Sequence, residues 1–198
     1  MGTEQGRNIL LKKIKDEVLN FTKSPLYEDR VKNKNLPVIG EGSHRAEIMF
    51  IGEAPGRNEA KTGRPFCGYA GKILNEFLLS VGIKREDVYI TNIVKDRPPF
   101  NRDPLSVEIE AYGQFLDRQI QIIQPKIIAT LGRFSMRYIM EKFGLGDKLD
   151  SISNLHGKKF KTKTDYGEVF VVVLYHPAAA IYNPKLKEVL KKDFKMLK

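Results

Sequence analysis

Three polar side chains stand where apolar strands are expected to end. Glu53 follows "IMFIG", Asn92 closes "DVYITN" and His176 follows "VVVLY". A carboxylate can position a water or stabilise a cation. A side-chain amide offers a donor and an acceptor that match one edge of a nucleobase, and a histidine can donate to an oxygen that becomes negative. Each residue also has an ordinary structural role, as a capping Glu, a turn Asn or a packed His.

The segment "GEAPGRNEAKTGRPFCGYAG", residues 52–71, follows the first of these strands. Its glycines allow backbone N–H groups to approach a ligand closely, but it matches neither GxxxxGK[ST] nor GxGxxG. Glu53 and Glu59 would repel a phosphate, so they suit a water or a cation better, unless they cap helices or pair with nearby arginines. Phe66 is either a platform for a flat base or a plug under the loop.

The charge balance favours a polyanionic partner, with nucleic acid first. The chain has 198 residues and a formal charge of +10, although a solvated basic surface would give the same balance. Arg97 and Arg102, in "DRPPFNRDP", are candidate phosphate contacts, as are the lysines at 158, 159, 161 and 163.

The remaining composition argues against several classes of protein. The only cysteine, Cys67, excludes a disulfide framework and fits a reducing compartment. Three histidines and one cysteine at these spacings give no metal signature. We find no apolar run of ~18–20 residues and no signal-peptide pattern at the N-terminus, so we expect a cytoplasmic protein with no membrane partner. Residues 1–7 are expected to be disordered.

Strands and helices alternate along the chain, which predicts parallel β-α-β units with helices on both faces of the sheet. Strands are expected at 48–52, 88–94, 126–131 and 169–175, and helices at 8–21, 68–82, 105–124, 133–144 and 183–198. A hairpin is expected within 158–177. The prediction is one α/β domain over residues 1–198. Ligands bind at the carboxyl ends of such strands, where Glu53, Asn92 and His176 fall.

Four segments together carry a resemblance. "GEAPGRNEAKTGRPFCGYAG", "YITNIVKDRPPFNRDP", "QPKIIATLGRF" and "YHPAAAIYNP" are similar, in order, to the uracil-DNA glycosylase superfamily, family 4. The similarity runs from about Phe21 to the C-terminus. It implies a three-layer α/β/α sandwich around a four-stranded parallel sheet. It also implies an enzyme that flips deoxyuridine out of DNA and hydrolyses its N-glycosidic bond, leaving an abasic site.

The resemblance assigns roles to individual residues. Catalysis falls to Glu53, Glu59 and His176, with His176 donating to the uracil carbonyl as negative charge develops. Which of Glu53 and Glu59 matters more for the water is left open. Uracil and the water are bound by the set Gly52, Ala54, Gly56, Phe66 and Asn92.

Two departures from the family pattern stand out. Family 4 enzymes usually hold an iron–sulfur cluster with four cysteines, but the corresponding positions here are Phe21, Ser24, Asp96 and Tyr112. Thiolates hold such clusters, so we expect no cluster and no other cofactor, with Phe21 and Tyr112 filling the space by apolar contact. In "HPAAAIYNP" the residue nearest the family's bulky wedge is the small Ala180, which leaves Ile181 or Tyr182 to contact the DNA stack.

The expected protein is therefore a cluster-free, monomeric uracil-DNA glycosylase acting on single- or double-stranded DNA. One alternative is a relative that removes another deaminated base, hypoxanthine or xanthine. A second alternative is a nucleic-acid-binding module that retains the fold but has lost catalysis.

Overall fold

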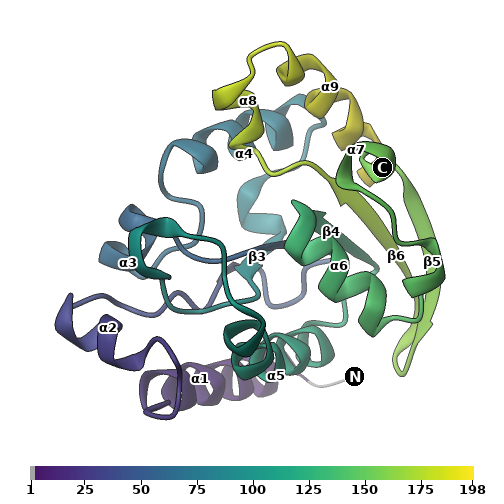
Figure 1. Cartoon of the computed structure of the whole chain (residues 1–198). Coiled ribbons are helices and arrows are strands. Elements are labelled where there is room, and N and C mark those ends of the chain that lie inside the picture. Colours follow the sequence, from purple (N-terminus) through teal and green to yellow (C-terminus); the bar gives the residue numbers. More distant parts are fainter. Residues whose placement is uncertain (1–2) are drawn as a thin grey trace.

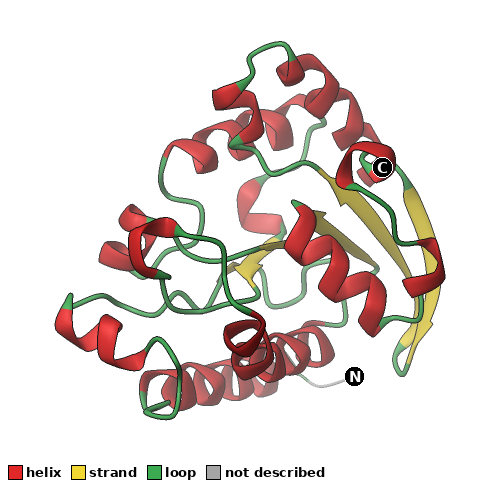
Figure 2. Cartoon of the chain, in the orientation of Figure 1, coloured by secondary structure: helices red, strands yellow, loops and turns green. Residues whose placement is uncertain are grey.

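The computed structural model describes residues 3–198 and contains one mixed β-sheet with helices on both faces (Figures 1 and 2). The strand order is β1-β3-β2-β4-β6-β5. The four central strands are parallel to one another, and both edge strands are antiparallel to their neighbours. The bounds are β1 Glu41–Gly42, β2 Ile48–Gly52, β3 Tyr89–Asn92, β4 Ile127–Leu131, β5 Lys159–Thr164 and β6 Gly167–Leu174.

The predicted fold class is confirmed, and one detail of it is corrected. The parallel core has the four expected strands, but the whole sheet has six rather than four. The hairpin expected within 158–177 forms β5 and β6, and β5 becomes an edge of the sheet. The two-residue β1 lies in a segment that reads as a turn-rich connection, and such a short pairing carries no periodic signal.

The side chains of β2 alternate between the two faces of the sheet, because successive residues of a strand point in opposite directions. Met49 and Ile51 pack with the helices on one face of the sheet, whereas Phe50 packs with the helices on the other face. All three side chains are fully buried. The sheet is therefore enclosed as the middle of three layers, which leaves its strand ends as the accessible sites (Figure 1).

The helices of the two outer layers follow the expected order. Their bounds are α1 Glu4–Leu19, α2 Tyr27–Lys32, α3 Arg57–Thr62, α4 Tyr69–Ser80, α5 Ser106–Ile123, α6 Arg133–Lys142, α7 Ile152–Leu155, α8 Ala179–Tyr182 and α9 Leu186–Asp193. The stop expected at Gly82 is present, with φ of +70° just beyond α4. The short helices α2 and α3 replace expected loops.

The expectation of disorder over residues 1–7 is wrong for its helical part. Helix α1 begins at Glu4, because the Thr3 hydroxyl accepts a hydrogen bond from the Gly6 N–H at 3.2 Å and caps the first turn. Arg7 then donates to the His44 and Ile123 carbonyls, both at 3.0 Å. Residues 1 and 2 lie outside the described part of the chain.

None of the helices within residues 3–198 combines the length and the apolar character that crossing a membrane requires.

Candidate active site

The three polar residues predicted at strand ends border two adjoining cavities at the carboxyl edge of the sheet. Asn92 ends β3, Glu53 directly follows β2, and His176 lies two residues beyond β6. The inner cavity has a volume of about 290 Å³ and the outer one about 320 Å³. Both are lined by Ala54, Gly56, Asn101, His176 and Ala178. The inner volume is at the small end for ligand pockets, as a single flat base would need.

Asn92 presents its side-chain amide to the inner cavity without a protein partner. The residue is only 2% exposed, yet among residues 3–198 no hydrogen bond engages its amide group. Its Oδ1 and the Phe66 ring both approach Gly52 so closely that a Cβ there would lie 2.3 Å and 2.8 Å from them. Gly52 is thus required by the close approach of the two groups that would read and stack a base.

Phe66 forms one wall of the inner cavity in an unfavourable backbone conformation. Its φ is +47°, a region that L-residues rarely adopt. The backbone of Gly71 packs directly against that of Phe66, because a Cβ on Gly71 would lie only 1.8 Å from the Phe66 carbonyl oxygen. The Phe66 and His176 rings lie 5.5 Å apart at an interplanar angle of 31°. The aromatic surface is therefore fixed next to the histidine.

His176 is held as a neutral donor. Burial lowers the pKa of its imidazole to about 4, although the charge of Glu59 opposes this shift. Its Nδ1 accepts a hydrogen bond from the Ala178 N–H at 3.2 Å, so in the neutral ring the proton resides on Nε2. Nε2–H is then available to an oxygen in the cavity that gains negative charge.

Glu53 lies in the outer cavity, and its pKa is raised to about 7. Burial is the largest cause, the nearby charge of Asp103 adds to it, and Arg133 opposes it. Arg133 is also ion-paired with Asp103. A carboxyl group balanced near neutral pH suits the positioning of a water or the stabilisation of a cation.

Glu59 has a different environment from Glu53. One of its carboxylate oxygens accepts hydrogen bonds from the backbone N–H groups of Cys67 and Gly68, at 3.1 and 2.9 Å. Gly68 is the N-cap of α4, so the carboxylate closes the loop that carries Phe66 and caps the following helix. Glu59 also lines the inner cavity, but its bonds are those of a residue that shapes the loop.

Sequence reasoning missed the fully buried Lys95 behind Asn92. Its Nζ donates to the Asn92 carbonyl and to Gln119 Oε1, both at 2.6 Å, and to Thr91 Oγ1 at 2.8 Å. Burial holds its pKa well below the usual value for a lysine. The three bonds fix the backbone that carries Asn92. The sequence around Lys95 gives no sign of this role, because a lysine that follows a strand is ordinarily expected to be exposed to solvent.

Arg97 and Arg102, the two predicted phosphate contacts in the loop after β3, have different hydrogen-bond partners. Arg97 donates from Nε to Asn101 Oδ1 at 2.6 Å. Arg102 makes a bidentate pair with the buried Glu108, at 2.9 and 2.6 Å. Arg102 therefore anchors the loop to α5, while Asn101, which sequence reasoning missed, lines both cavities.

The three residues considered for a DNA wedge all lie in helix α8 but differ in their exposure to solvent. Ala180 is buried, whereas Ile181 and Tyr182 are exposed, at 38% and 87%. Tyr182 also lines the outer cavity. The small Ala180 thus packs inward, and the outward-facing bulk at this edge comes from Ile181 and Tyr182.

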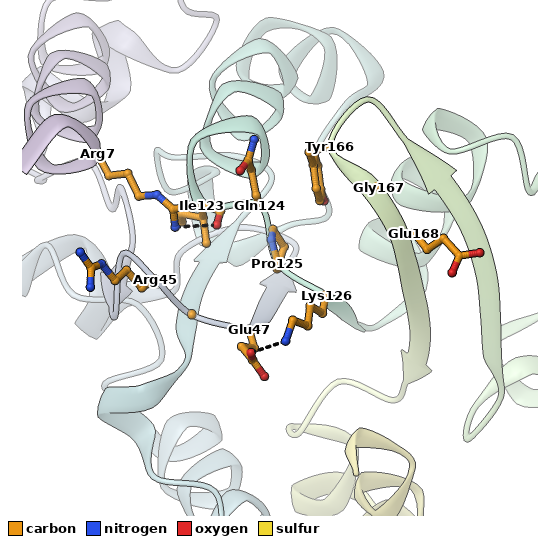
Figure 3. A pocket seen from close by; sticks show the side chains of 11 residues that line it. Arg7, Arg45, Glu47, Ile123, Gln124, Pro125, Lys126, Tyr166, Gly167 and Glu168 are labelled. Carbon is orange, nitrogen blue, oxygen red and sulfur yellow. Dashed lines mark hydrogen bonds and ion pairs between the residues drawn. The ribbon is translucent and has the colours of Figure 1, made fainter. Parts of the chain in front are cut away.

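A larger cavity, of about 500 Å³, lies at the opposite edge of the sheet, where β2 and β4 begin (Figure 3). Its charged side chains largely pair with neighbours: Lys126 with Glu47, and Arg7 with the Ile123 carbonyl. It contains none of the predicted site residues, and the sequence signals that mark ligand chemistry all lie at the other edge.

The four positions that the resemblance assigns to cluster cysteines do meet in space, but their side chains do not suit an iron–sulfur cluster. Ser24 Oγ lies 2.5 Å from the Tyr112 hydroxyl, which donates to Asp96 Oδ2 at 2.5 Å. The Phe21 ring contacts Tyr112 edge-to-face at 5.8 Å between centroids. Oxygen atoms and aromatic rings occupy these four positions, whereas iron–sulfur clusters need thiolate ligands.

Arg30 completes this buried group. It lies 3.3 Å from Asp96 and donates to the Val18 and Leu19 carbonyls. The expected apolar contact of Phe21 and Tyr112 is present. Sequence reasoning did not foresee that Tyr112 is also part of a hydrogen-bonded chain. Within residues 3–198, no group of three or more His, Cys, Asp and Glu side chains is placed to hold a metal ion.

Known proteins are similar to this chain over most of its length. Residues 39–198 match the model of the uracil DNA glycosylase superfamily. The chain is 50% identical over 189 residues to a type-4 uracil-DNA glycosylase of Sulfurisphaera tokodaii, covering 95% of this chain and 83% of the relative. It is 38% identical over 194 residues to the type-4 enzyme of Thermotoga maritima, covering 97% and 95%. The chain belongs to the uracil DNA glycosylase superfamily.

Proposed function

We propose that this protein is a monofunctional uracil-DNA glycosylase that releases uracil from DNA and leaves an abasic site. The observation that carries the proposal is the inner cavity, where a free amide on Asn92, the Phe66 ring and a neutral His176 border one base-sized space. The high identity to type-4 uracil-DNA glycosylases over nearly the whole chain supports the same reaction.

The geometry supports a division of labour in the reaction. The Asn92 amide recognises the polar edge of the extruded base, and Phe66 stacks on its face. As the glycosidic bond breaks, the electron pair stays with the uracil, and His176 Nε2–H stabilises the resulting negative charge. The ionised Glu53 stabilises the cationic sugar and positions the attacking water.

The two acidic residues then have separate roles. Glu53 acts on the sugar and the water, because it lines the outer cavity and its carboxyl group, with a pKa of about 7, ionises near neutral pH. Glu59 holds the loop through the Cys67 and Gly68 N–H groups. Gly52, Ala54 and Gly56 are small, and a Cβ on Gly56 would lie 2.7 Å from a Glu59 carboxylate oxygen. A larger residue there would therefore displace Glu59, which lines the inner cavity.

We further propose that the enzyme works without an iron–sulfur cluster, as a monomer, in the cytoplasm. The first point rests on the donor set at the family's cluster positions, where Ser24, Asp96 and Tyr112 already bond one another. The visible spectrum of the purified protein tests it directly, because a bound cluster would add a broad absorption band near 400 nm, which we do not expect.

A substrate panel tests the assignment of the base. Labelled oligonucleotides carry uracil, hypoxanthine or xanthine at one position, and alkali then breaks the strand at abasic sites. We expect alkali-dependent cleavage at uracil alone or far above the other two. Preferential cleavage at hypoxanthine or xanthine would replace the proposed substrate, and DNA binding without cleavage of any base would favour a binding module.

A further inference from the structure

Phe100 is the most exposed of the large apolar side chains within residues 3–198. It is 97% exposed and lies in the Pro99–Asn101 turn that follows β3. An aromatic ring fully in water contributes nothing to the core. Its position next to a cavity of the active site is therefore the feature that needs a physical reason.

The backbone holds Phe100 in an unfavourable conformation. Its φ is +56° and its ψ is +17°, and Asn101 also has a φ of +56°. Two consecutive left-handed residues that are not glycine are rare. A glycine would relieve the strain at position 100, so the ring is present although the fold alone does not favour it.

The turn is held rigidly from both sides. The Asn101 and Arg102 N–H groups donate to the Pro98 and Pro99 carbonyls, both at 3.1 Å. Arg97 holds the Asn101 side chain, and Arg102 is clamped by the buried Glu108. An exposed ring on an anchored turn loses little conformational freedom when it meets a partner.

The turn borders the mouth of the proposed active site. Asn101 lines both cavities with His176, and the outer cavity is also lined by Tyr182, from α8. Tyr182 is exposed as well. Two exposed aromatic side chains, Phe100 from the turn after β3 and Tyr182 from α8, thus lie near the opening through which a nucleotide would enter.

We propose that Phe100 stacks on a base next to the extruded nucleotide in duplex DNA and keeps the duplex open there. This rests on the proposed function, because it needs a nucleotide drawn into the cavity. A base fits better than a protein partner: one ring on a turn that the cationic Arg97 bonds through Asn101 matches a base face with a phosphate nearby, whereas a stable protein interface needs a far larger patch.

The test compares Phe100→Gly with Phe100→Tyr and with Leu79→Ala. Glycine removes the ring and suits the positive φ, so the variant should keep its fold, as its melting temperature will report. Tyrosine keeps the ring. Leu79 is 78% exposed on α4 and serves as a matched exposed apolar residue away from the cavities. Each protein is assayed on the same uracil oligonucleotide, single-stranded and in duplex, under single-turnover conditions.

We expect Phe100→Gly to release uracil from the duplex about 10-fold more slowly than the wild type, since a stacked base is worth roughly that factor or more. The single-stranded rate should change less than about 2-fold, because no duplex has to be held open. Phe100→Tyr and Leu79→Ala should match the wild type on both substrates. Equal duplex rates for Phe100→Gly and wild type would overturn the inference and leave the proposed function intact.

A binding measurement separates this inference from the proposed function. The probe is a duplex with a tetrahydrofuran abasic analogue and 2-aminopurine beside it, which needs no excision. Wild type and Phe100→Tyr should alter the 2-aminopurine fluorescence and bind about 10-fold more tightly than Phe100→Gly. Wild type and Phe100→Gly giving the same affinity and fluorescence would refute the stacking role, even for a protein that released no uracil.

Discussion

A carboxyl group, an amide and an imidazole meet three different environments at the ends of β2, β3 and β6. Burial raises the pKa of Glu53 to about 7 and lowers that of His176 to about 4. Both shifts favour the uncharged form of a group removed from water. In the proposed reaction the uncharged imidazole of His176 is the hydrogen-bond donor, whereas Glu53 acts in its ionised form.

Replacing His176 by alanine tests the proposed donor. The loss of one donor to a developing negative charge typically costs 100- to 1,000-fold in rate, and we expect His176→Ala to show a loss of that size in single-turnover uracil release. Because the pKa of His176 is about 4, His176 should not titrate near its ordinary value of 6.5. The pH profile of the wild-type rate should therefore contain no inflection there that disappears in His176→Ala. A loss of less than 3-fold would contradict the role.

Glu53 should give the rate its pH dependence. The rate should rise through about pH 7 as Glu53 ionises, and Glu53→Gln should remove this rise and lower the rate at pH 8 by at least 100-fold. A Glu53→Gln profile with the same inflection as the wild type would assign the titration to another group.

The same pKa predicts an effect on stability with the opposite sense. The pKa of Glu53 is higher in the folded state than in the unfolded chain, so protonated Glu53 favours folding. Its contribution to the free energy of unfolding is fully present below about pH 4.5 and is lost as the pH rises through about 7. Glu53→Gln should therefore melt a few degrees higher than the wild type at pH 8, with little difference at pH 4.5. Calorimetry at the two pH values checks this.

At the scale of elements, the parallel strands explain why much of the site was predictable. Parallel strands end at one edge, so Glu53, Asn92 and His176 could be placed together from the sequence. The conformations of the loops that follow these strands could not be predicted. The bonds from Glu59 to Cys67 and Gly68 depend on how an irregular loop closes, and the left-handed turn at Phe100 and Asn101 contradicts local preference.

Long-range pairs were also beyond sequence reasoning. Arg30 and Asp96 are 66 residues apart in the chain, and nothing local marks them as a pair. In the structure Arg30 bonds the C-terminal end of α1 and pairs with Asp96 in the segment that follows β3. Tyr112 of α5 bonds both Asp96 and Ser24, so the group joins α1, α2 and α5 to that segment. The group thus connects these elements by hydrogen bonds.

This buried group should matter for stability. Asp96→Ala leaves the Arg30 guanidinium buried without its carboxylate, and breaking such a pair typically costs about 3–5 kcal/mol. The control is Lys126→Ala, which breaks an exposed pair with Glu47 and should cost less than about 1 kcal/mol. Urea unfolding measures both. Equal, small losses in the two variants would show that the group does not hold these elements together.

At the scale of the whole molecule, the excess of basic residues is spread over many elements, and part of it is neutralised locally. Lys161 pairs with Glu168 and Lys187 with Glu76, while Arg97 lies next to the cavities with only the neutral Asn101 as its hydrogen-bond partner among residues 3–198. The net charge of +10 attracts DNA in general, and the position of individual cations decides which of them contact phosphates.

Salt dependence of duplex binding distinguishes these cations. The logarithm of the binding constant should fall linearly with the logarithm of salt concentration, and each phosphate contact contributes about 0.9 to the slope. Arg97→Gln should reduce the slope by about that amount. Lys126→Gln, at the opposite edge of the sheet, should leave it unchanged. If both variants altered the slope equally, the assigned binding face would be wrong.

The most direct test of the central claim is uracil release by Asn92→Ala, measured under single-turnover conditions together with its affinity for the same duplex. The Asn92 amide is a free polar group in the base-sized cavity, and hydrogen bonds to a group that becomes charged are worth about 1.5–3 kcal/mol. We predict that the wild type releases uracil and that Asn92→Ala releases it about 10- to 150-fold more slowly with nearly unchanged affinity for DNA. A wild type that binds DNA but releases no uracil, or an Asn92→Ala variant as fast as the wild type, would contradict the account.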